Sequence, residues 1–152
     1  MAALSAAASR LTRNSDGSRI GNLVVTTSDT IYQGSLLCMN LSTGRVQAAT
    51  AAASLEFVGL ALETVTGNTG GTKRCKFITN IEAQVAIITS ALTTADMFQN
   101  VAIATDNEVT TGSAAGTAGV RVYCGYPTES ASAGVWWIML GASAAGGANA
   151  VT

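Results

Sequence analysis

The chain contains no histidine, a single proline and few charged or aromatic residues. Asp, Glu, Lys and Arg make up 11% of its 152 residues, against roughly 25% in an average soluble domain. Without histidine, no Ser-His-Asp or Cys-His catalytic arrangement exists within this chain alone. Acid–base catalysis and metal binding mostly use the residue types that are scarce here. The composition therefore favours a protein that is not an enzyme and that acts through contacts.

The charge balance and the hydropathy exclude further classes of protein. The formal net charge is −1, whereas proteins that bind nucleic acids usually present a basic field, so no nucleic-acid partner is expected. The chain has no apolar run of about 18 residues, so no membrane span and no membrane partner are predicted. Serines and arginines interrupt segment 1–16, which therefore lacks the apolar core of a signal peptide.

Three cysteines, Cys38, Cys75 and Cys124, are far apart in the sequence and form no C-x-x-C pair. Their spacing matches neither a zinc site nor a thioredoxin-like motif. We expect three reduced, mostly buried thiols that behave as small apolar groups. A disulfide between two of them is the alternative.

The predicted fold is all-β: a small β-sandwich or barrel of about eight or nine short strands, with an extended N-terminal arm. Short β-branched or apolar segments alternate with turn sequences, and no long amphipathic helix is present. The glycine at position 59 predicts a β-bulge or a close backbone approach within its strand. The strongest predicted strands are 23–27, 35–40, 45–49, 57–62, 82–89, 101–105, 108–111, 120–124 and 135–140.

We divide the chain into an N-terminal arm (1–20), a β domain (21–141) and a flexible C-terminal tail (142–152). The arm is rich in Ala and Ser and contains Arg10, Arg13 and Arg19. Two interpretations of it stay open. It is either a frayed tail or an arm that becomes ordered on contact with a partner.

Two sequence patterns are incomplete versions of known sites. The loop 67–73 is rich in glycine, but a phosphate-binding loop ends in Gly-Lys-Ser/Thr and leads into a helix, and here a strand-like segment follows. Asp106 and Glu108 are closely spaced acids in a predicted hairpin turn, where acids ordinarily serve turn formation and solvation. A calcium site there lacks further regularly spaced ligands. No catalytic residue, metal site or cofactor is predicted.

Trp136 and Trp137 are adjacent in the strongly apolar segment 135–140. In a strand, neighbouring side chains point to opposite faces, so one tryptophan can fill the core while the other needs a cover. Either a loop of this chain or a second subunit supplies that cover, and both alternatives stay open. Large side chains are few, so the core is thin and we expect stability to be shared with neighbouring subunits.

Two segments, 30–40 (TIYQGSLLCMN) and 57–65 (FVGLALETV), resemble the capsid cement and decoration proteins of tailed bacteriophages. Segment 92–106 and the Trp-rich strand 136–140 are also similar to that family. The resemblance implies a β-rich structural virion protein that binds the outer surface of a phage head. There it would stabilise the capsid by bridging major capsid subunits. It also implies a homo-oligomer, often a trimer, without catalytic residues.

On this resemblance, the expected partners are the major capsid protein and further copies of the chain in a homotrimer. The expected location is the outer capsid surface of the virion, after synthesis in the host cytoplasm. A head fibre or other virion appendage and a carbohydrate-binding β module are the alternative functions. The candidate residues for capsid or subunit contact are Arg10, Arg13, Arg19, Trp136 and Trp137.

Overall fold

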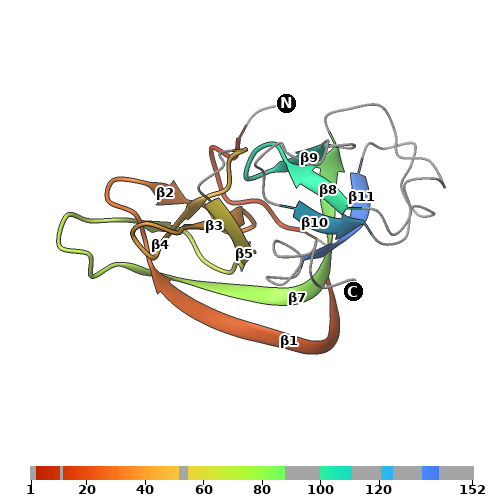
Figure 1. Cartoon of the computed structure of the whole chain (residues 1–152), viewed down its shortest axis with the longest axis horizontal. Coiled ribbons are helices and arrows are strands. Elements are labelled where there is room, and N and C mark those ends of the chain that lie inside the picture. The colour runs from red at the N-terminus through yellow and green to blue at the C-terminus, as the bar shows by residue number, and fades with distance from the viewer. Residues whose placement is uncertain are drawn as a thin grey trace.

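The computed structural model describes residues 3–10, 12–51, 55–87, 100–110, 121–124 and 135–140. Within these ranges the chain consists of strands and their connections, without a helix (Figure 1). The predicted all-β class is confirmed for this part of the chain. Accordingly, none of the described residues belongs to a helix long and apolar enough to cross a membrane.

The described residues form eleven strands, of which nine belong to one sheet. The order in this sheet is β11-β10-β8-β9-β7-β5-β3-β4, and β1 pairs with β7 beside this path. Strands β2 and β6 form a separate two-stranded sheet. The strands are β1 (Thr12–Val24), β2 (Thr30–Ile31), β3 (Leu36–Asn40), β4 (Arg45–Ala48), β5 (Leu55–Ala61), β6 (Val65–Thr66), β7 (Arg74–Ile87), β8 (Asn100–Ile103), β9 (Glu108–Thr110), β10 (Arg121–Cys124) and β11 (Val135–Leu140).

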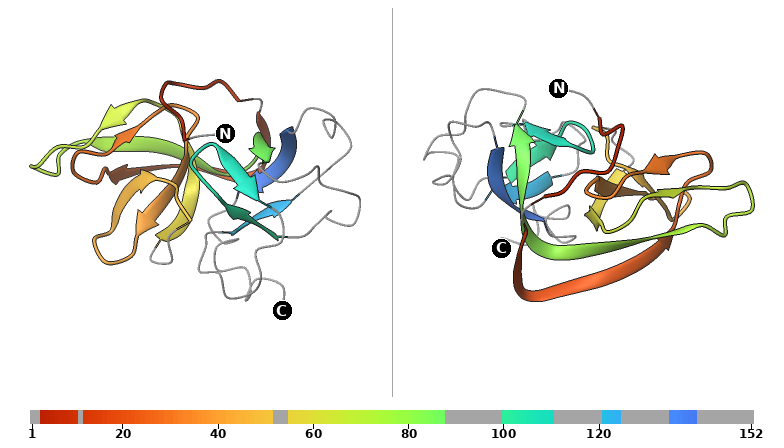
Figure 2. Two further views of the ribbon diagram at one scale, coloured as in Figure 1. Left: turned by 90° about the horizontal axis from the view of Figure 1, so that it is seen from above. Right: turned by 180° about the vertical axis from the view of Figure 1, so that it is seen from behind.

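The long strand β7 connects two groups of strands (Figure 2). Its first part, residues 74–79, pairs antiparallel with the end of β1, and residues 77–78 pair with β5. Its second part, residues 81–86, pairs antiparallel with β11, and its last two residues run parallel to β9. Both groups therefore depend on the placement of this one strand.

One group is a curled five-stranded sheet, a half-barrel, formed by β1, β7, β5, β3 and β4. An isolated parallel bridge between Val25 and Val46 links β4 to the chain just after β1. The N–H of Thr26 also donates to the carbonyl oxygen of Val46 at 2.8 Å. These contacts bring the two ends of the curled sheet together.

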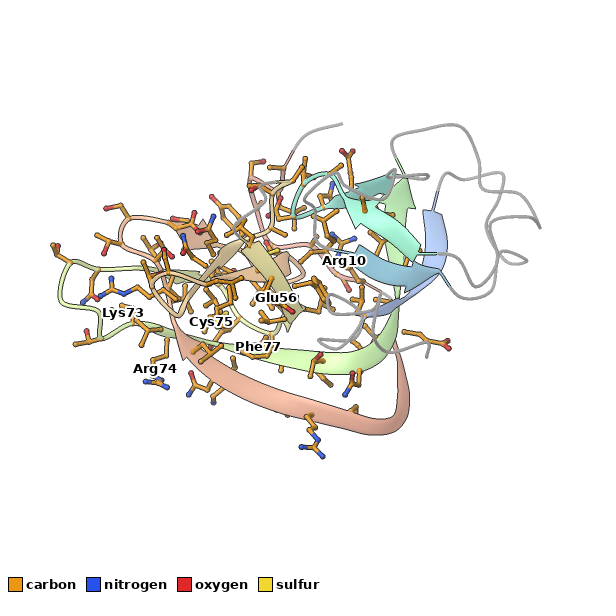
Figure 3. The ribbon with its side chains drawn as sticks, viewed as in Figure 1. Arg10, Glu56, Lys73, Arg74, Cys75 and Phe77 are labelled. Atoms are coloured by element: carbon orange, nitrogen blue, oxygen red, sulfur yellow. The ribbon has the colours of Figure 1, made fainter. Side chains whose placement is uncertain are left out.

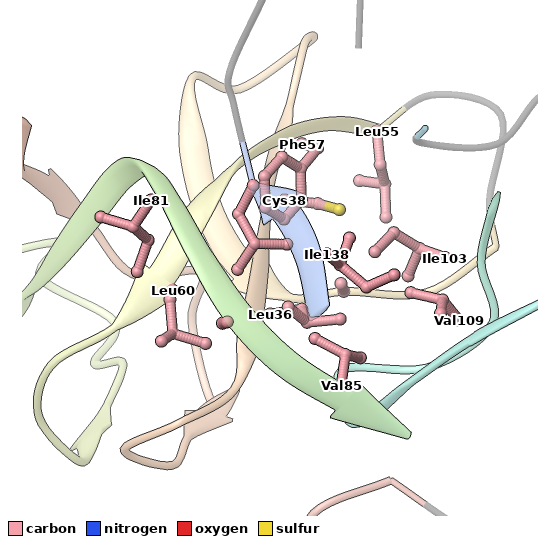
Figure 4. Close-up of a cluster of buried hydrophobic side chains, with 13 residues drawn as sticks. Leu36, Cys38, Leu55, Phe57, Leu60, Ile81, Val85, Ile103, Val109 and Ile138 are labelled. Atoms are coloured by element: carbon pink, nitrogen blue, oxygen red, sulfur yellow. The ribbon is translucent and has the colours of Figure 1, made fainter. Parts of the chain in front are cut away.

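The buried apolar side chains form two clusters. The larger cluster combines residues of both strand groups, with Phe57 and Leu36 from the half-barrel and Val85 and Ile138 from β7 and β11 (Figure 4). The smaller cluster lies within the half-barrel and its small two-stranded sheet. It consists of Val25, Ile31, Leu37, Val46, Val58, Ala61, Cys75 and Phe77.

The glycine predicted to mark a bulge does so. The pairing of β3 with β5 shifts register between Leu37, which faces Gly59, and the next residue, which faces Phe57. A Cβ atom on Gly59 would lie 2.4 Å from the carbonyl oxygen of Ile78 in β7. Both the predicted bulge and the predicted close backbone approach are confirmed.

The N-terminal part of the sheet differs from the prediction. β1 begins at Thr12, whereas the sequence predicts a first strand at 23–27 and an arm up to residue 20. The proposed boundary at residue 20 therefore falls inside a strand. Segment 12–20 is mostly polar and has no apolar alternation, because it lies at the edge of the sheet. Its pairing partner, and not its own composition, determines its conformation.

Strand β7 is also longer than predicted, because segments 74–77 and 82–89 are parts of one strand. Asn80 lies between them with a φ of 58°. The register between β1 and β7 shifts at the same level, between Asn14 and Arg19. Both strands curve strongly along their length (Figure 1). Asn tolerates this left-handed backbone conformation better than most residues.

Most of the other predicted strands agree with the structure to within two residues, namely 35–40, 45–49, 57–62, 101–105, 108–111, 120–124 and 135–140. The predicted flexible tail, 142–152, lies outside the described residues.

Candidate functional site

Residues 3–10, which we call the strap, have no regular secondary structure and are fastened to two loops far apart in the sequence. The N–H of Ala8 donates to the carbonyl oxygen of Gln33 at 2.9 Å, in the loop between β2 and β3. The N–H of Leu4 donates to Oδ1 of Asp106 at 2.9 Å, in the turn between β8 and β9. The strap thus joins the two groups of strands.

Arg10 is the main polar side chain of the strap (Figure 3). Its Nε donates to the carbonyl oxygen of Gly34. Its Nη2 donates to Oδ1 of Asn107 at 2.9 Å and approaches the carbonyl oxygen of the same residue at 3.4 Å. We call Gly34, Ser35, Asp106 and Asn107 the cradle: Gly34, Asp106 and Asn107 accept hydrogen bonds from the strap, and Ser35 donates to Asp106.

Asp106 is the buried acid of the cradle, with 2% of its surface exposed. Its Oδ2 accepts a hydrogen bond from Oγ of Ser35 at 2.8 Å, and its Oδ1 accepts the bond from the strap. Its carbonyl oxygen accepts from the N–H of Leu36 at 2.7 Å. The prediction that this acid serves solvation of a hairpin turn is therefore wrong. The turn exists, but its carboxylate points inward and fastens other segments.

The charges of Arg10 and Asp106 influence each other. Burial lowers the pKa of Arg10 from its ordinary value, while the negative charge of Asp106 acts in the opposite direction. Arginine stays protonated through the physiological range even after such a shift. Because a buried carboxylate is costly unless it is hydrogen-bonded and near an opposite charge, this cation stabilises the cradle.

Gly34 lets the strap approach closely. It has a φ of 87°, and a Cβ atom there would lie 2.2 Å from the carbonyl oxygen of Ala8. Only glycine adopts that conformation readily and leaves room for the strap backbone. This residue belongs to the segment 30–40 that carries the family resemblance.

A small pocket of about 170 Å³ lies beside the strap. The strap contributes Ala8, Ser9 and Arg10 to its lining. Gly34 and β5, with Leu60 and Ala61, are among the other lining residues. Apart from Arg10, none of the residues that line this pocket has an ionisable side chain, so the lining supplies no ordinary group for acid–base chemistry.

The predicted contact residues are distributed over the strap, β1 and β11. Arg19 is exposed on β1, whereas Arg10 has the intramolecular partners given above. Arg13 pairs in register with Glu82 of β7. The side chain of Arg13 lies outside the described part of the structure.

The two tryptophans lie on β11, where Trp136 pairs with Val85 and Trp137 pairs with Gln84 of β7. Strand β11 is on the other edge of β7 from Arg13, since residues 81–83 pair with β1 on one side and with β11 on the other. The tryptophan side chains lie outside the described part. A contact role for these residues stays a prediction.

The sequence does not reveal the cradle. Asp106 and Asn107 have the ordinary composition of a turn, and nothing local indicates that a segment about 100 residues away would cover them. The available signal was the lone arginine in an otherwise uncharged segment rich in alanine, together with a Tyr-x-Gly turn at residues 32–34. Both appear in the sequence, but their pairing depends on the tertiary fold.

Two cysteines are free and buried, as predicted. Burial raises the pKa of Cys38 to about 12 and that of Cys75 to about 11. Their thiols are therefore protonated near neutral pH and poorly nucleophilic. The side chain of Cys124 lies outside the described residues.

Among the described residues, no group of three or more His, Cys, Asp or Glu side chains is placed to hold a metal ion. Glu108 is buried with 1% of its surface exposed, so the second acid of the predicted turn also points inward. No family model matches the chain, and no curated protein matches it either. Its function is therefore inferred from its residues and their geometry.

Proposed function

We propose that the protein is a structural virion protein that binds the outer surface of a phage head and stabilises the capsid by bridging major capsid subunits. The observation that carries the proposal is the use of the buried polar groups. Ser35 and the backbone of Leu4 donate to the buried Asp106, and Arg10 donates to Gly34 and Asn107. Their role is to hold segments together, as expected for a protein that works by contact.

The resemblance to phage cement proteins gains support from the position of its segments. Segment 30–40 supplies two cradle residues and β3, and segment 57–65 contains most of β5, which pairs with β3. The two segments therefore form one continuous structural unit. Similarity in such a unit is better support for a shared architecture than similarity in two unrelated loops.

The outer face of β1 and β7 is the surface we propose for capsid contact. In antiparallel strands, directly opposed residues lie on the same face, and Ile20, Asn22, Arg74 and Lys76 follow that pattern. All four are exposed, and Ile20 exposes 68% of its surface. The opposite face of these two strands carries the buried Phe77 and other apolar residues.

This outer face combines the exposed apolar side chain of Ile20 with two cations of β7, Arg74 and Lys76. Arg74 extends outward from β7 (Figure 3), whereas Arg19, next to Ile20 in β1, points to the opposite face of its strand. Such a face would suit an acidic patch on the major capsid protein, because complementary charges favour encounter and fix orientation. We propose that Arg13 and Arg19 contribute to contact along the edge of β1, outside this outer face. Trp136 and Trp137 of β11 are proposed to contact a second subunit.

We further propose a homotrimer on the outer capsid surface. Few large side chains fill the core, and repeated weak contacts over a symmetric shell multiply modest affinities. We also propose that the strands close into a small barrel. The bridge between Val25 and Val46 and the pairing of β11 with β7 support this closure.

Binding to undecorated phage heads tests the proposed function. Purified protein is mixed with heads that lack it, and the amount that co-sediments is measured against concentration. We expect saturable binding, weakened at least about tenfold by Ile20→Lys, which places a charge within the apolar part of the contact. The matched control is Leu41→Lys, because Leu41 exposes 59% of its surface in the turn after β3.

The proposal fails if the unaltered protein does not co-sediment with the heads at any concentration. Equal loss of binding in the Ile20 and Leu41 variants would refute the assigned face alone. Assembly into a long shaft would favour a head fibre, and binding to a glycan array would favour a carbohydrate-binding module.

A further inference from the structure

The contact between strap and cradle has the character of peptide recognition. Two backbone N–H groups of the strap, those of Leu4 and Ala8, donate to the domain. One side chain, that of Arg10, donates to the carbonyl oxygen of Gly34 and to Asn107. Main-chain hydrogen bonds and one specific side chain are what a domain uses to bind an extended peptide. A strap from a second copy makes the same contacts where that copy's β1 begins close to the cradle, because only one residue separates Arg10 from Thr12, the first residue of β1.

The strap loses little stabilisation from apolar burial when it leaves the cradle. Its residues Ala3, Ser5, Ala6, Ala7 and Ser9 are exposed, and their side chains are small. Because few apolar atoms of the strap are buried, the hydrophobic effect stabilises its docked state only modestly. The strap is therefore held mainly by its polar contacts.

An empty cradle is destabilised much more strongly, because its buried acid loses partners. Asp106 would keep its hydrogen bond to Ser35 but would lose the bond from Leu4 and the nearby cation. A buried carboxylate left without its opposite charge is strongly unfavourable. An empty cradle therefore favours any second strap that presents the same N–H groups and the same arginine.

We propose that the cradle of one copy accepts residues 3–10 of a second copy, so that Arg10 of each subunit completes the Asp106 site of its neighbour. Exchange of an identical element is a low-cost route from monomer to oligomer. Each copy has one strap and one cradle, so the contact is head-to-tail and closes into a ring when the rotation permits. This inference goes beyond capsid binding and does not require it.

The balance between the two states depends on concentration. Within one copy, the linkage to β1 gives the strap a high effective concentration at its own cradle, which favours self-docking in dilute solution. Copies that are assembled or crowded at high density offer neighbouring cradles at a comparable concentration. Exchange then adds stability to the assembly without any new type of contact.

Cross-linking between two different variants tests the exchange. One variant carries Ala8→Cys in the strap and the other carries Gln33→Cys beside the cradle, both in a Cys124→Ser background. Cys38 and Cys75 are buried and serve as an internal baseline. The two variants are co-expressed, so that copies assemble together, and are treated with a short bismaleimide. Any product that joins position 8 to position 33 must connect two different copies.

In the control, the Ala8→Cys variant is co-expressed with a Leu41→Cys variant in the same background. Leu41 lies in an exposed turn. We expect the 8–33 product to exceed the 8–41 product by at least about fivefold at high concentration, and to decrease when Arg10→Ala is added. An 8–33 yield no greater than the 8–41 yield would overturn the proposal. So would an 8–33 yield that Arg10→Ala leaves unchanged. Neither outcome depends on whether the protein binds a phage head.

Discussion

At the scale of single residues, the sparse charges of this chain are used inside the molecule more than the sequence suggests. A turn acid expected to face solvent is buried, and an arginine expected in a loose arm reaches the same turn. Asp106 and Arg10 are almost 100 positions apart in the sequence. Sequence patterns report local period and turn chemistry, so they identify the turn correctly and miss the burial of its carboxylate.

Removal of the cradle cation is the first prediction. Arg10→Ala is expected to lower the free energy of unfolding by about 1–3 kcal/mol, because it leaves Asp106 buried with a weaker set of partners. Urea unfolding followed by tryptophan fluorescence measures the change. Arg19→Ala is the control, since Arg19 is exposed, and it should change the stability by less than about 0.5 kcal/mol. Equal effects of the two variants would contradict the assigned role.

Alkaline pH gives a second prediction at this scale. The pKa of Cys38 is raised from 9.0 to about 12 by burial, so the folded protein retains this proton where the unfolded chain loses it. The contribution is fully present below pH 9 and is lost as the pH rises from 9 towards 12. We expect the stability to fall over this window, and less steeply in Cys38→Ala. Denaturant midpoints at several pH values measure both slopes, and parallel slopes would contradict the prediction.

At the scale of elements, the sequence predicts the short, apolar strands well and the long, polar one poorly. β3 has three consecutive buried apolar residues and β11 is apolar throughout its sequence, and this apolar character is visible in the sequence. β1 is mostly polar and lies at a sheet edge, so only its partner β7 reveals it. The bulge in β5 could be predicted from the sequence, because a glycine within a strand usually marks a bulge or a close approach of another backbone.

The bulge in β5 gives a prediction for this scale. Gly59→Ala is expected to destabilise the protein by roughly 2 kcal/mol or more, because the new Cβ would meet the Ile78 carbonyl oxygen at 2.4 Å. Gly70→Ala is the matched control, since the nearest atoms to a Cβ there are 3.9 Å away. Thermal unfolding of both variants checks this. A melting temperature of Gly59→Ala equal to that of the control would show that the backbone approach is not restrictive.

The strap gives a second prediction at the scale of elements. Gly34→Ala is expected to displace the strap, because an added Cβ would lie 2.2 Å from the Ala8 carbonyl oxygen. The amide of Ala8 should then exchange with solvent at least about tenfold faster, while β-sheet amides keep their protection. Hydrogen exchange read by NMR measures both. Unchanged protection at Ala8 would mean that the strap does not depend on this glycine.

At the scale of the whole molecule, composition predicts the fold class and a contact-based function, but not how the parts are joined. The alternation of short apolar segments with turn sequences was sufficient for the all-β class, whereas the contact-based function stays a prediction. The division into an arm and a domain does not follow the observed strands, because β1 extends from Thr12. The strap and cradle join the two groups of strands through contacts that no local pattern encodes.

The stabilisation of phage heads by this protein is the most direct measurement of the proposed role. Undecorated, DNA-filled heads are heated with and without saturating protein, and DNA release is followed by the fluorescence of an intercalating dye. We predict that release shifts to higher temperature in the presence of the protein, and that Ile20→Lys removes most of the shift while Leu41→Lys preserves it. An unchanged release temperature at saturating protein would contradict the account.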